Sequence, residues 1–157
     1  SPKNEINELL KGLTLGRISI GALSVGTATA AYEKAIRYSK DRIAFNKPIN
    51  HFQSNSFKLA DMAIKIEASE LLVYHAAWLK DKGENFIKEA AMAKLYASEA
   101  AMEITREAIQ IHGGYGYVHE YDVERFFRDA KILEIVEGTS EMQRLTISRE
   151  IIKDKMI

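Results

Sequence analysis

Glu137 is the residue whose surroundings most suggest chemistry. It ends an apolar run in the segment IVEGTSEMQR, residues 135–144, and Gly138 and Thr139 follow it at once. A carboxylate held at such a corner can serve as a general base, because a bound ligand would exclude water and so favour its protonated form. It can equally be a partner for a helix dipole, since acidic side chains stabilise helix N-termini. Spacing alone leaves both interpretations open.

A helix is predicted to begin directly after this corner. Ser140 is followed three residues later by Gln143, which is the spacing of a capping box, so Ser140 is predicted as the N-cap. Gly138 gives the preceding turn its backbone freedom. The sequence therefore predicts that Glu137 stands in a tight turn at the entrance to the last helix.

The elements that must position this corner are all predicted to be helical, over residues 13–40, 50–82, 85–112, 121–134 and 140–153. In the second and third of them apolar residues recur at steps of three and four, which is the helical period. These stripes are Phe57, Ala60, Ile64, Ala68, Leu71, His75 and Trp78, then Ala93, Ala97, Ala100, Ile104, Ala108 and Ile111. No alternation of period two persists, so no sheet is expected.

Breaker residues set the predicted helix ends. The first helix is expected to stop near Asp41, because Asn46 and Pro48 follow it. Gly83 is the predicted C′ residue of the second helix, and the glycines of HGGYGY end the third. Long helices with short connections favour antiparallel packing. The predicted fold class is all-α: an up-and-down four-helix bundle with an additional short C-terminal helix, in one helical domain over residues 1–157.

The composition excludes several classes of function. Lys plus Arg and Asp plus Glu both number 22, so the formal net charge is zero and no basic footprint for nucleic acid is present. The 157 residues contain no cysteine, which excludes disulfides and thiolate metal sites. None of the four histidines follows a glutamate by three residues and no HExxH motif occurs, so no metal site is predicted. No apolar run is long enough to predict a membrane span.

Two separated segments resemble the C-terminal domain of the acyl-CoA dehydrogenases. They are RYSKDRIAFNKPINHFQSNSFKLADM and AIQIHGGYGYVHEYDVERFFRDAKILEIVEGTSEMQR, and the resemblance extends from about residue 13 to residue 152. It implies a flavoenzyme that uses FAD to convert a saturated acyl-CoA to a trans-2-enoyl-CoA, and whose C-terminal domain is a four-helix bundle. It also implies a homo-oligomer, dimer or tetramer, that passes electrons to electron-transferring flavoprotein, in the cytoplasm or in a mitochondrial matrix.

For the substrate side, the resemblance implies that Glu137 is the base that removes the α proton. Its own N–H would help to polarise the thioester carbonyl. Arg17 and Gly138 are expected beside the substrate, although Arg17 can also be a helix-surface arginine with a carboxylate partner. Some family members keep the base just before this arginine, where this chain has Gly16, which cannot be a base.

For the cofactor side, the resemblance implies contacts from two motifs and from the corner itself. Arg42 and Phe45 would reach the flavin dinucleotide of a neighbouring subunit, and a guanidinium can bond two phosphate oxygens at once. The remaining expected cofactor residues are Gln110, Gly113, Gly114, Thr139 and Glu141. Ala44, Asn46 and Glu141 depart from the residues common in the family. Without the resemblance, Arg42 is a cation near a helix C-terminus and the glycines form a helix cap.

The resemblance also sets limits. The N-terminal helical domain and the middle β domain of the family are absent from this chain, so the isolated polypeptide is expected to have no dehydrogenase activity. Two alternatives remain: a noncatalytic helical oligomerisation module, and a domain of a related flavin oxidase.

Overall fold

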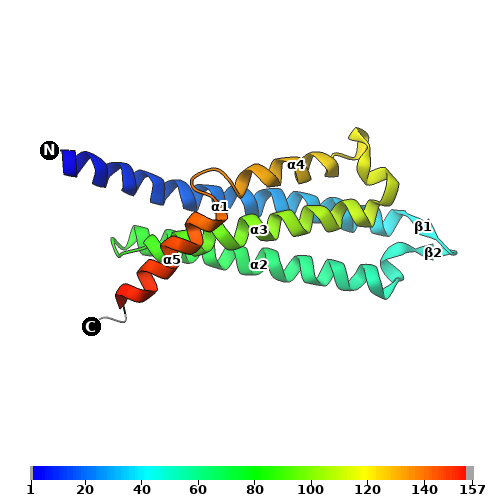
Figure 1. Ribbon diagram of the computed structural model, residues 1–157. Helices are drawn as coiled ribbons and strands as arrows, with labels where there is room; N and C mark the ends of the chain where they lie inside the picture. Colours follow the sequence, from blue (N-terminus) through cyan, green and yellow to red (C-terminus); the bar gives the residue numbers. More distant parts are fainter. Residues whose placement is uncertain (1, 155–157) are drawn as a thin grey trace.

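The computed structural model describes the backbone of residues 2–154 and the side chains of residues 12–153. Five helices form it: α1 (Pro2–Asp41), α2 (Gln53–Asp81), α3 (Ile87–His112), α4 (Val123–Leu133) and α5 (Ser140–Asp154). Helices α1 to α4 run side by side along one axis, and α5 leaves the bundle obliquely (Figure 1). The predicted all-α bundle with a further C-terminal helix is confirmed, although α1 begins earlier than predicted.

Helix α3 is the centre of the bundle and contacts each of the other four helices. Its buried face consists mainly of alanine, which lets neighbouring backbones approach closely. All six residues of the predicted stripe on this helix are buried: Ala93, Ala97, Ala100, Ile104, Ala108 and Ile111. The core therefore owes its tight packing to small side chains on the central helix.

The predicted stripe of α2 lies on the opposite side from the core. Ile64 and Leu71 are 65% and 62% exposed, and Phe57 and Trp78 are exposed as well. The residues of α2 that pack inside the chain are Met62, Ile66, Ser69, Val73, Ala76 and Leu79. The period identified the helix, but α2 is apolar on two faces, and periodicity does not say which face packs within the chain.

A small hairpin joins α1 to α2, where no strand was expected. Strands β1 (Ile43–Ala44) and β2 (Lys47–Pro48) pair antiparallel, with Ile43 opposite Pro48. Phe45 and Asn46 have φ of 50° and 64°, the positive pair of a type I′ turn. Two-residue strands are too short to show an alternating pattern, which is why the prediction missed them. The 3₁₀ turn η1 (Ile49–His51) leads into α2.

The predicted helix ends are largely correct. Gly83 lies at φ 73° and its N–H donates to the carbonyl of Lys80, while the N–H of Glu84 donates to that of Leu79. These are the two bonds of a Schellman motif, so Gly83 is the C′ residue. The glycine cluster after α3 differs from the prediction, because Gly113–Tyr117 continues as the 3₁₀ turn η2, followed by η3 (His119–Tyr121).

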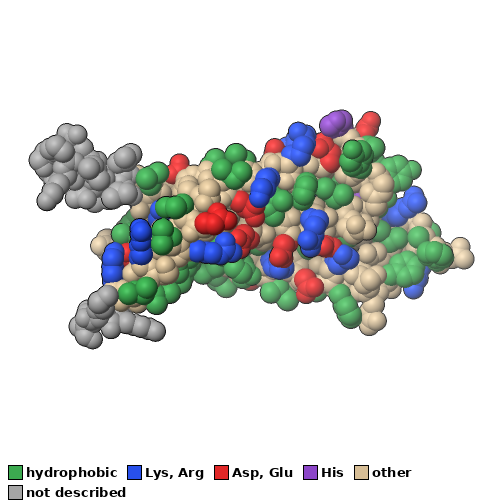
Figure 2. All heavy atoms as spheres, in the orientation of Figure 1, with side chains coloured by type: hydrophobic (Ala, Val, Ile, Leu, Met, Phe, Trp, Pro, Cys, Tyr) green, Lys and Arg blue, Asp and Glu red, His purple; other side chains and the backbone are tan. Residues whose placement is uncertain are grey.

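Acidic and basic side chains are intermixed on the face of the molecule shown in Figure 2. Ion pairs such as Arg144 with Glu99, at 2.7 Å, account for part of this mixing. In the part of the chain that the structure describes, no helix is long and apolar enough to cross a membrane.

Candidate functional site

The corner that carries Glu137 is the connection between α4 and α5; we call residues 134–143 the Glu137 corner. The N–H of Ser140 spans it, donating to the carbonyl of Glu134 at 3.1 Å. Glu137 has φ 55° and Gly138 has φ 95°, so two successive residues take positive φ. A non-glycine residue there is strained, and such strain persists only where surrounding contacts enforce it.

The carboxylate of Glu137 lies directly against α1. A Cβ built on Gly16 would stand 2.6 Å from both Cδ and Oε2 of Glu137, closer than real atoms approach. Only glycine at position 16 leaves room for this carboxylate. Helix α1 and the Glu137 corner therefore meet with the carboxylate between them.

Arg17 is the cation beside this carboxylate. It is half-buried, and burial lowers the pKa of its guanidinium while the charge of Glu137 raises it in part. Its Nε is buried without a hydrogen-bond partner, and no described carboxylate oxygen lies within 4.0 Å of it. Arg17 thus interacts with the charge of Glu137 without forming a direct ion pair.

The predicted capping box is wrong. The Oγ of Ser140 is buried and has no partner among the described residues. The side chain of Gln143 reaches past the helix start, and its Nε2 donates to the carbonyls of Glu137 at 3.1 Å and Gly138 at 2.8 Å. The carboxylate of Glu141 accepts hydrogen bonds from its own backbone N–H and from the Thr139 hydroxyl. These bonds, the first more than the second, lower the pKa of the Glu141 carboxyl below its ordinary value.

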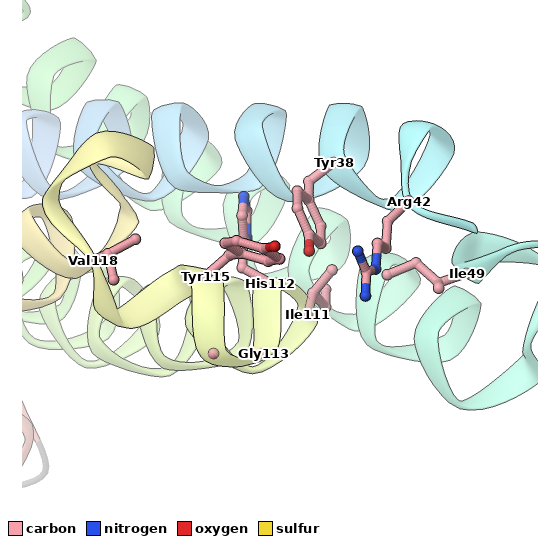
Figure 3. A pocket seen from close by; sticks show the side chains of 9 residues that line it. Tyr38, Arg42, Ile49, Ile111, His112, Gly113, Tyr115 and Val118 are labelled. Atoms are coloured by element: carbon pink, nitrogen blue, oxygen red, sulfur yellow. The ribbon is translucent and has the colours of Figure 1, made fainter. Parts of the chain in front are cut away.

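A cavity of about 480 Å³ lies at the other end of α1, where the hairpin and η2 meet (Figure 3). We call residues 42–49 and 110–118 the glycine end. The rings of Tyr38 and His112 stack at 4.3 Å, and His112 Nδ1 donates to the carbonyl of Ala108 at 2.7 Å. Burial lowers the pKa of His112. The cavity wall is therefore aromatic and fixed.

Arg42 stands at the mouth of this cavity, 5.7 Å from the centre of the Tyr115 ring. Within residues 12–153 it has no ion-pair partner, so its guanidinium can bind an external anion. Gly113 has φ 59°, and nothing lies within 4 Å of a Cβ built on Gly113 or Gly114. Arg42 has no carboxylate partner among the described residues, and the backbone of Gly113 and Gly114 is exposed at the same cavity. This combination suits a large anionic ligand.

The family comparison covers nearly the whole chain. The family model described as "Acyl-CoA dehydrogenase, C-terminal domain" matches residues 6–152. The chain belongs to this family. The human short-chain specific acyl-CoA dehydrogenase, named mitochondrial, is 51% identical over 144 residues, covering 92% of this chain and 35% of that protein. The caffeyl-CoA reductase-Etf complex subunit CarC of Acetobacterium woodii is 48% identical over 158 residues, covering 96% and 42%.

Among solved structures, butyryl-CoA dehydrogenase from Megasphaera elsdenii matches this acyl-CoA dehydrogenase domain with a TM-score of 0.90 and 50% identity. The match covers 91% of this chain and 37% of that one. The chain thus spans about two-fifths of the length of the relatives it matches.

The ten predicted site residues of this acyl-CoA dehydrogenase domain fall into two groups. One group lies in or beside the Glu137 corner and consists of Arg17, Glu137, Gly138, Thr139 and Glu141. The other group lies at the glycine end and consists of Arg42, Phe45, Gln110, Gly113 and Gly114. Phe45, 90% exposed at the hairpin tip, and Gln110 do not line the cavity. The 24 helical steps from Arg17 to Asp41, each of about 1.5 Å, separate the groups by roughly 36 Å along α1.

The sequence reasoning missed Lys94. It is fully buried in α3, and its Nζ donates to the carbonyl of Gly138 at 2.9 Å. A lone lysine among the alanines Ala90, Ala91, Ala93 and Ala97 was a readable signal, because a cation on an apolar face needs a partner. The contact of Gly16 with Glu137 was also missed, and no local pattern could show it.

Proposed function

We propose that this chain is the C-terminal domain of a longer FAD-dependent acyl-CoA dehydrogenase in which Glu137 removes the α proton of an acyl-CoA thioester. The observation that carries the proposal is the carboxylate of Glu137 packed between Gly16 and the Glu137 corner, near Arg17. A general base must be held within hydrogen-bond reach of the proton it takes, and the close fit against Gly16 limits where this carboxylate can lie.

The backbone of the corner supports the same chemistry. In the described part of the chain, the N–H groups of Glu137 and Gly138 donate to no other backbone group. An N–H at this place can bond the thioester oxygen as negative charge develops on it, which lowers the barrier to proton removal. Arg17 balances the charge of the carboxylate and stands where the CoA portion is expected.

FAD is the proposed cofactor, and when bound it would accept the hydride from the β carbon. The unpaired Arg42 would bond its pyrophosphate, and the open backbone of Gly113 and Gly114 would lie against its adenosine side. Phe45 and Gln110 would add contacts from the hairpin and the end of α3. At the Glu137 corner, Thr139 and Glu141 are the proposed cofactor contacts.

The separation of the two groups implies an oligomer. Only a five-carbon ribityl chain joins the flavin ring to its pyrophosphate, so roughly 36 Å of helix cannot be bridged by one FAD. The ring near Glu137 and the pyrophosphate at Arg42 would then belong to two flavins in two subunits. The exposed α2 stripe, with Ile64, Leu71 and Trp78 at heptad spacing, suits a helix of a second copy. We infer a homo-oligomer, a dimer or a tetramer.

The remaining parts of the proposal rest on the relatives. An N-terminal helical domain and a β domain would precede this domain in the full-length protein and complete the site. Electron-transferring flavoprotein is the proposed acceptor, since the Acetobacterium relative is named as a subunit of an Etf complex. The proposed location is the cytoplasm, or the mitochondrial matrix in a eukaryote, as in the name of the human relative.

A second candidate function is the reverse reaction, in which the α and β carbons of an acyl-CoA gain hydrogen instead of losing it. The Acetobacterium relative is named a reductase, so the enzyme could reduce an enoyl-CoA instead. Glu137 would then give its proton to the α carbon. Supplying crotonyl-CoA with a reduced electron donor and comparing the rate with that of butyryl-CoA oxidation distinguishes the two directions.

The decisive experiment replaces Glu137 by Gln in the full-length protein. Bleaching of the flavin by butyryl-CoA should slow by about 10³-fold, because general-base catalysis typically contributes 10²–10⁴. Flavin content should stay unchanged, since the amide keeps the shape of the carboxylate. Glu84→Gln, which removes an exposed carboxylate after α2, is the control and should bleach normally. Normal bleaching by the Glu137→Gln variant would mean that Glu137 is not the base.

A further inference from the structure

Two fully buried hydrogen-bond donors converge on the Glu137 corner from different helices. Lys94 comes from the N-terminal third of α3 and Gln143 from the first turn of α5, and both are 0% exposed. The carbonyl of Gly138 accepts from both, at 2.9 Å from Lys94 Nζ and 2.8 Å from Gln143 Nε2. Gln143 Nε2 also donates to the carbonyl of Glu137 at 3.1 Å.

The ammonium group of Lys94 is buried without an ion-pair partner in direct contact. A buried ammonium is normally stabilised by a nearby carboxylate, because desolvation of a lone charge is strongly unfavourable. No described carboxylate oxygen lies within 4.0 Å of its Nζ. Burial lowers the pKa of Lys94, while Glu134, Glu99 and Glu141 exert favourable charges from further away and Arg17 an unfavourable one. Its one hydrogen bond is to Gly138.

The two donors act on the strained part of the chain. Glu137 and Gly138 take φ of 55° and 95°, and a Cβ on Gly138 would stand 2.9 Å from Gln143 Nε2. The carbonyls of both residues therefore turn into the bundle, toward Lys94 and Gln143. The carboxylate of Glu137 lies against Gly16 of α1.

We propose that Lys94 and Gln143 are positioning residues that clamp the two carbonyls and thereby hold the Glu137 carboxylate at its reacting position. The proposal rests on the proposed function, because it assigns the pair to the same proton removal. Neither side chain contacts the substrate. Loss of a donor frees the corner to relax from its strained conformation, which misplaces the carboxylate without removing it.

The test uses Lys94→Met and Gln143→Met in the full-length protein, since methionine keeps each side chain's length and removes its donor. The probe is 3-thiabutyryl-CoA, whose sulfur replaces the β carbon, so that the α proton can leave but no hydride can follow. Exchange of that proton for deuterium from D₂O, followed by mass spectrometry, reports proton removal alone. Lys80→Met, which removes an exposed lysine of α2, is the control.

Each variant should keep its flavin and bind the probe with unchanged affinity. α-Proton exchange should fall about tenfold to a hundredfold, the cost of a small misplacement of a catalytic group. Amide hydrogen exchange of residues 134–140 should rise, with that of α2 unchanged. Because both donors serve one carbonyl, the double variant should lose less than the product of the two single losses.

The outcomes distinguish failure of the proposed function from failure of the proposed clamp by Lys94 and Gln143. Wild-type protein that neither bleaches with butyryl-CoA nor exchanges the probe's α proton contradicts the proposed function itself. Active wild-type protein whose folded variants exchange at the wild-type rate contradicts the clamp, as do multiplicative losses in the double variant. If Lys94→Met does not fold, the Gln143→Met variant alone decides, by its exchange rate and the amide exchange of the corner.

Discussion

The Glu137 corner and the glycine end differ in how many contacts from other helices hold their residues in place. At the corner, three separate helices supply one contact each: Gly16 from α1, Lys94 from α3 and Gln143 from α5. At the glycine end, Arg42 and Gly114 are exposed around an open cavity of about 480 Å³. A group that transfers a proton needs fixed placement, whereas a surface that binds a large ligand needs access. This contrast fits the proposed function, in which the Glu137 corner transfers a proton and the glycine end binds a large cofactor.

The contrast between the two regions is tested most strongly by Gly16→Ala, a change in α1, in the full-length protein. The new Cβ would meet the end of a flexible side chain, Cδ and Oε2 of Glu137 at 2.6 Å, so the carboxylate moves and the backbone does not have to. Flavin bleaching by butyryl-CoA should slow by about a hundredfold. The melting temperature should hold or rise, because alanine favours a helix over glycine by about 1 kcal/mol.

Gly26→Ala is the matched control for this change. It lies on the same helix, and nothing stands within 4 Å of a Cβ built there. It should therefore gain the helical stability and keep the wild-type bleaching rate. Equal rates in the two variants would show that the Glu137 carboxylate is not confined by α1, and the precision assigned to the corner would be wrong.

Sequence patterns predicted what is local in this molecule. The alanine stripe of α3 and the C′ residue Gly83 follow from spacing, and the structure confirms both. Each of these signals lies within a few residues of the feature it predicts.

What the sequence could not predict depends on contacts between distant segments. The spacing of Ser140 and Gln143 indicated a capping box, but the Gln143 amide instead donates to the carbonyls of Glu137 and Gly138. The fit of Gly16 against Glu137 joins residues that are far apart in the chain. In α2, the neighbouring helices decide which of the two apolar faces is buried. The spacing of apolar residues within α2 carries no information about those neighbours.

At the glycine end, the corresponding test is Arg42→Met. A lost charge-assisted hydrogen bond costs about 1.5–3 kcal/mol, so FAD affinity should fall by about tenfold to a hundredfold. At saturating FAD the bleaching rate should be that of the wild type, because Glu137 is untouched. Titration of the flavin-free protein measures the affinity. Lys47→Met removes the same charge from the hairpin, where Lys47 Nζ lies 4.2 Å from the Phe52 ring, and should bind FAD normally.

The smallest expected effects separate two glycines of the glycine end. A Cβ at Gly116 would stand 2.6 Å from the carbonyl oxygen of Ile109, a backbone atom that cannot yield cheaply. Gly116→Ala should lower the free energy of unfolding by about 1–3 kcal/mol, measured as a lower melting temperature. Gly114→Ala meets nothing within 4 Å, so it should melt like the wild type and weaken only FAD binding. If Gly114→Ala instead lowered the melting temperature and left FAD affinity unchanged, that glycine would serve the fold, and the glycine end would lose its role as an open binding surface.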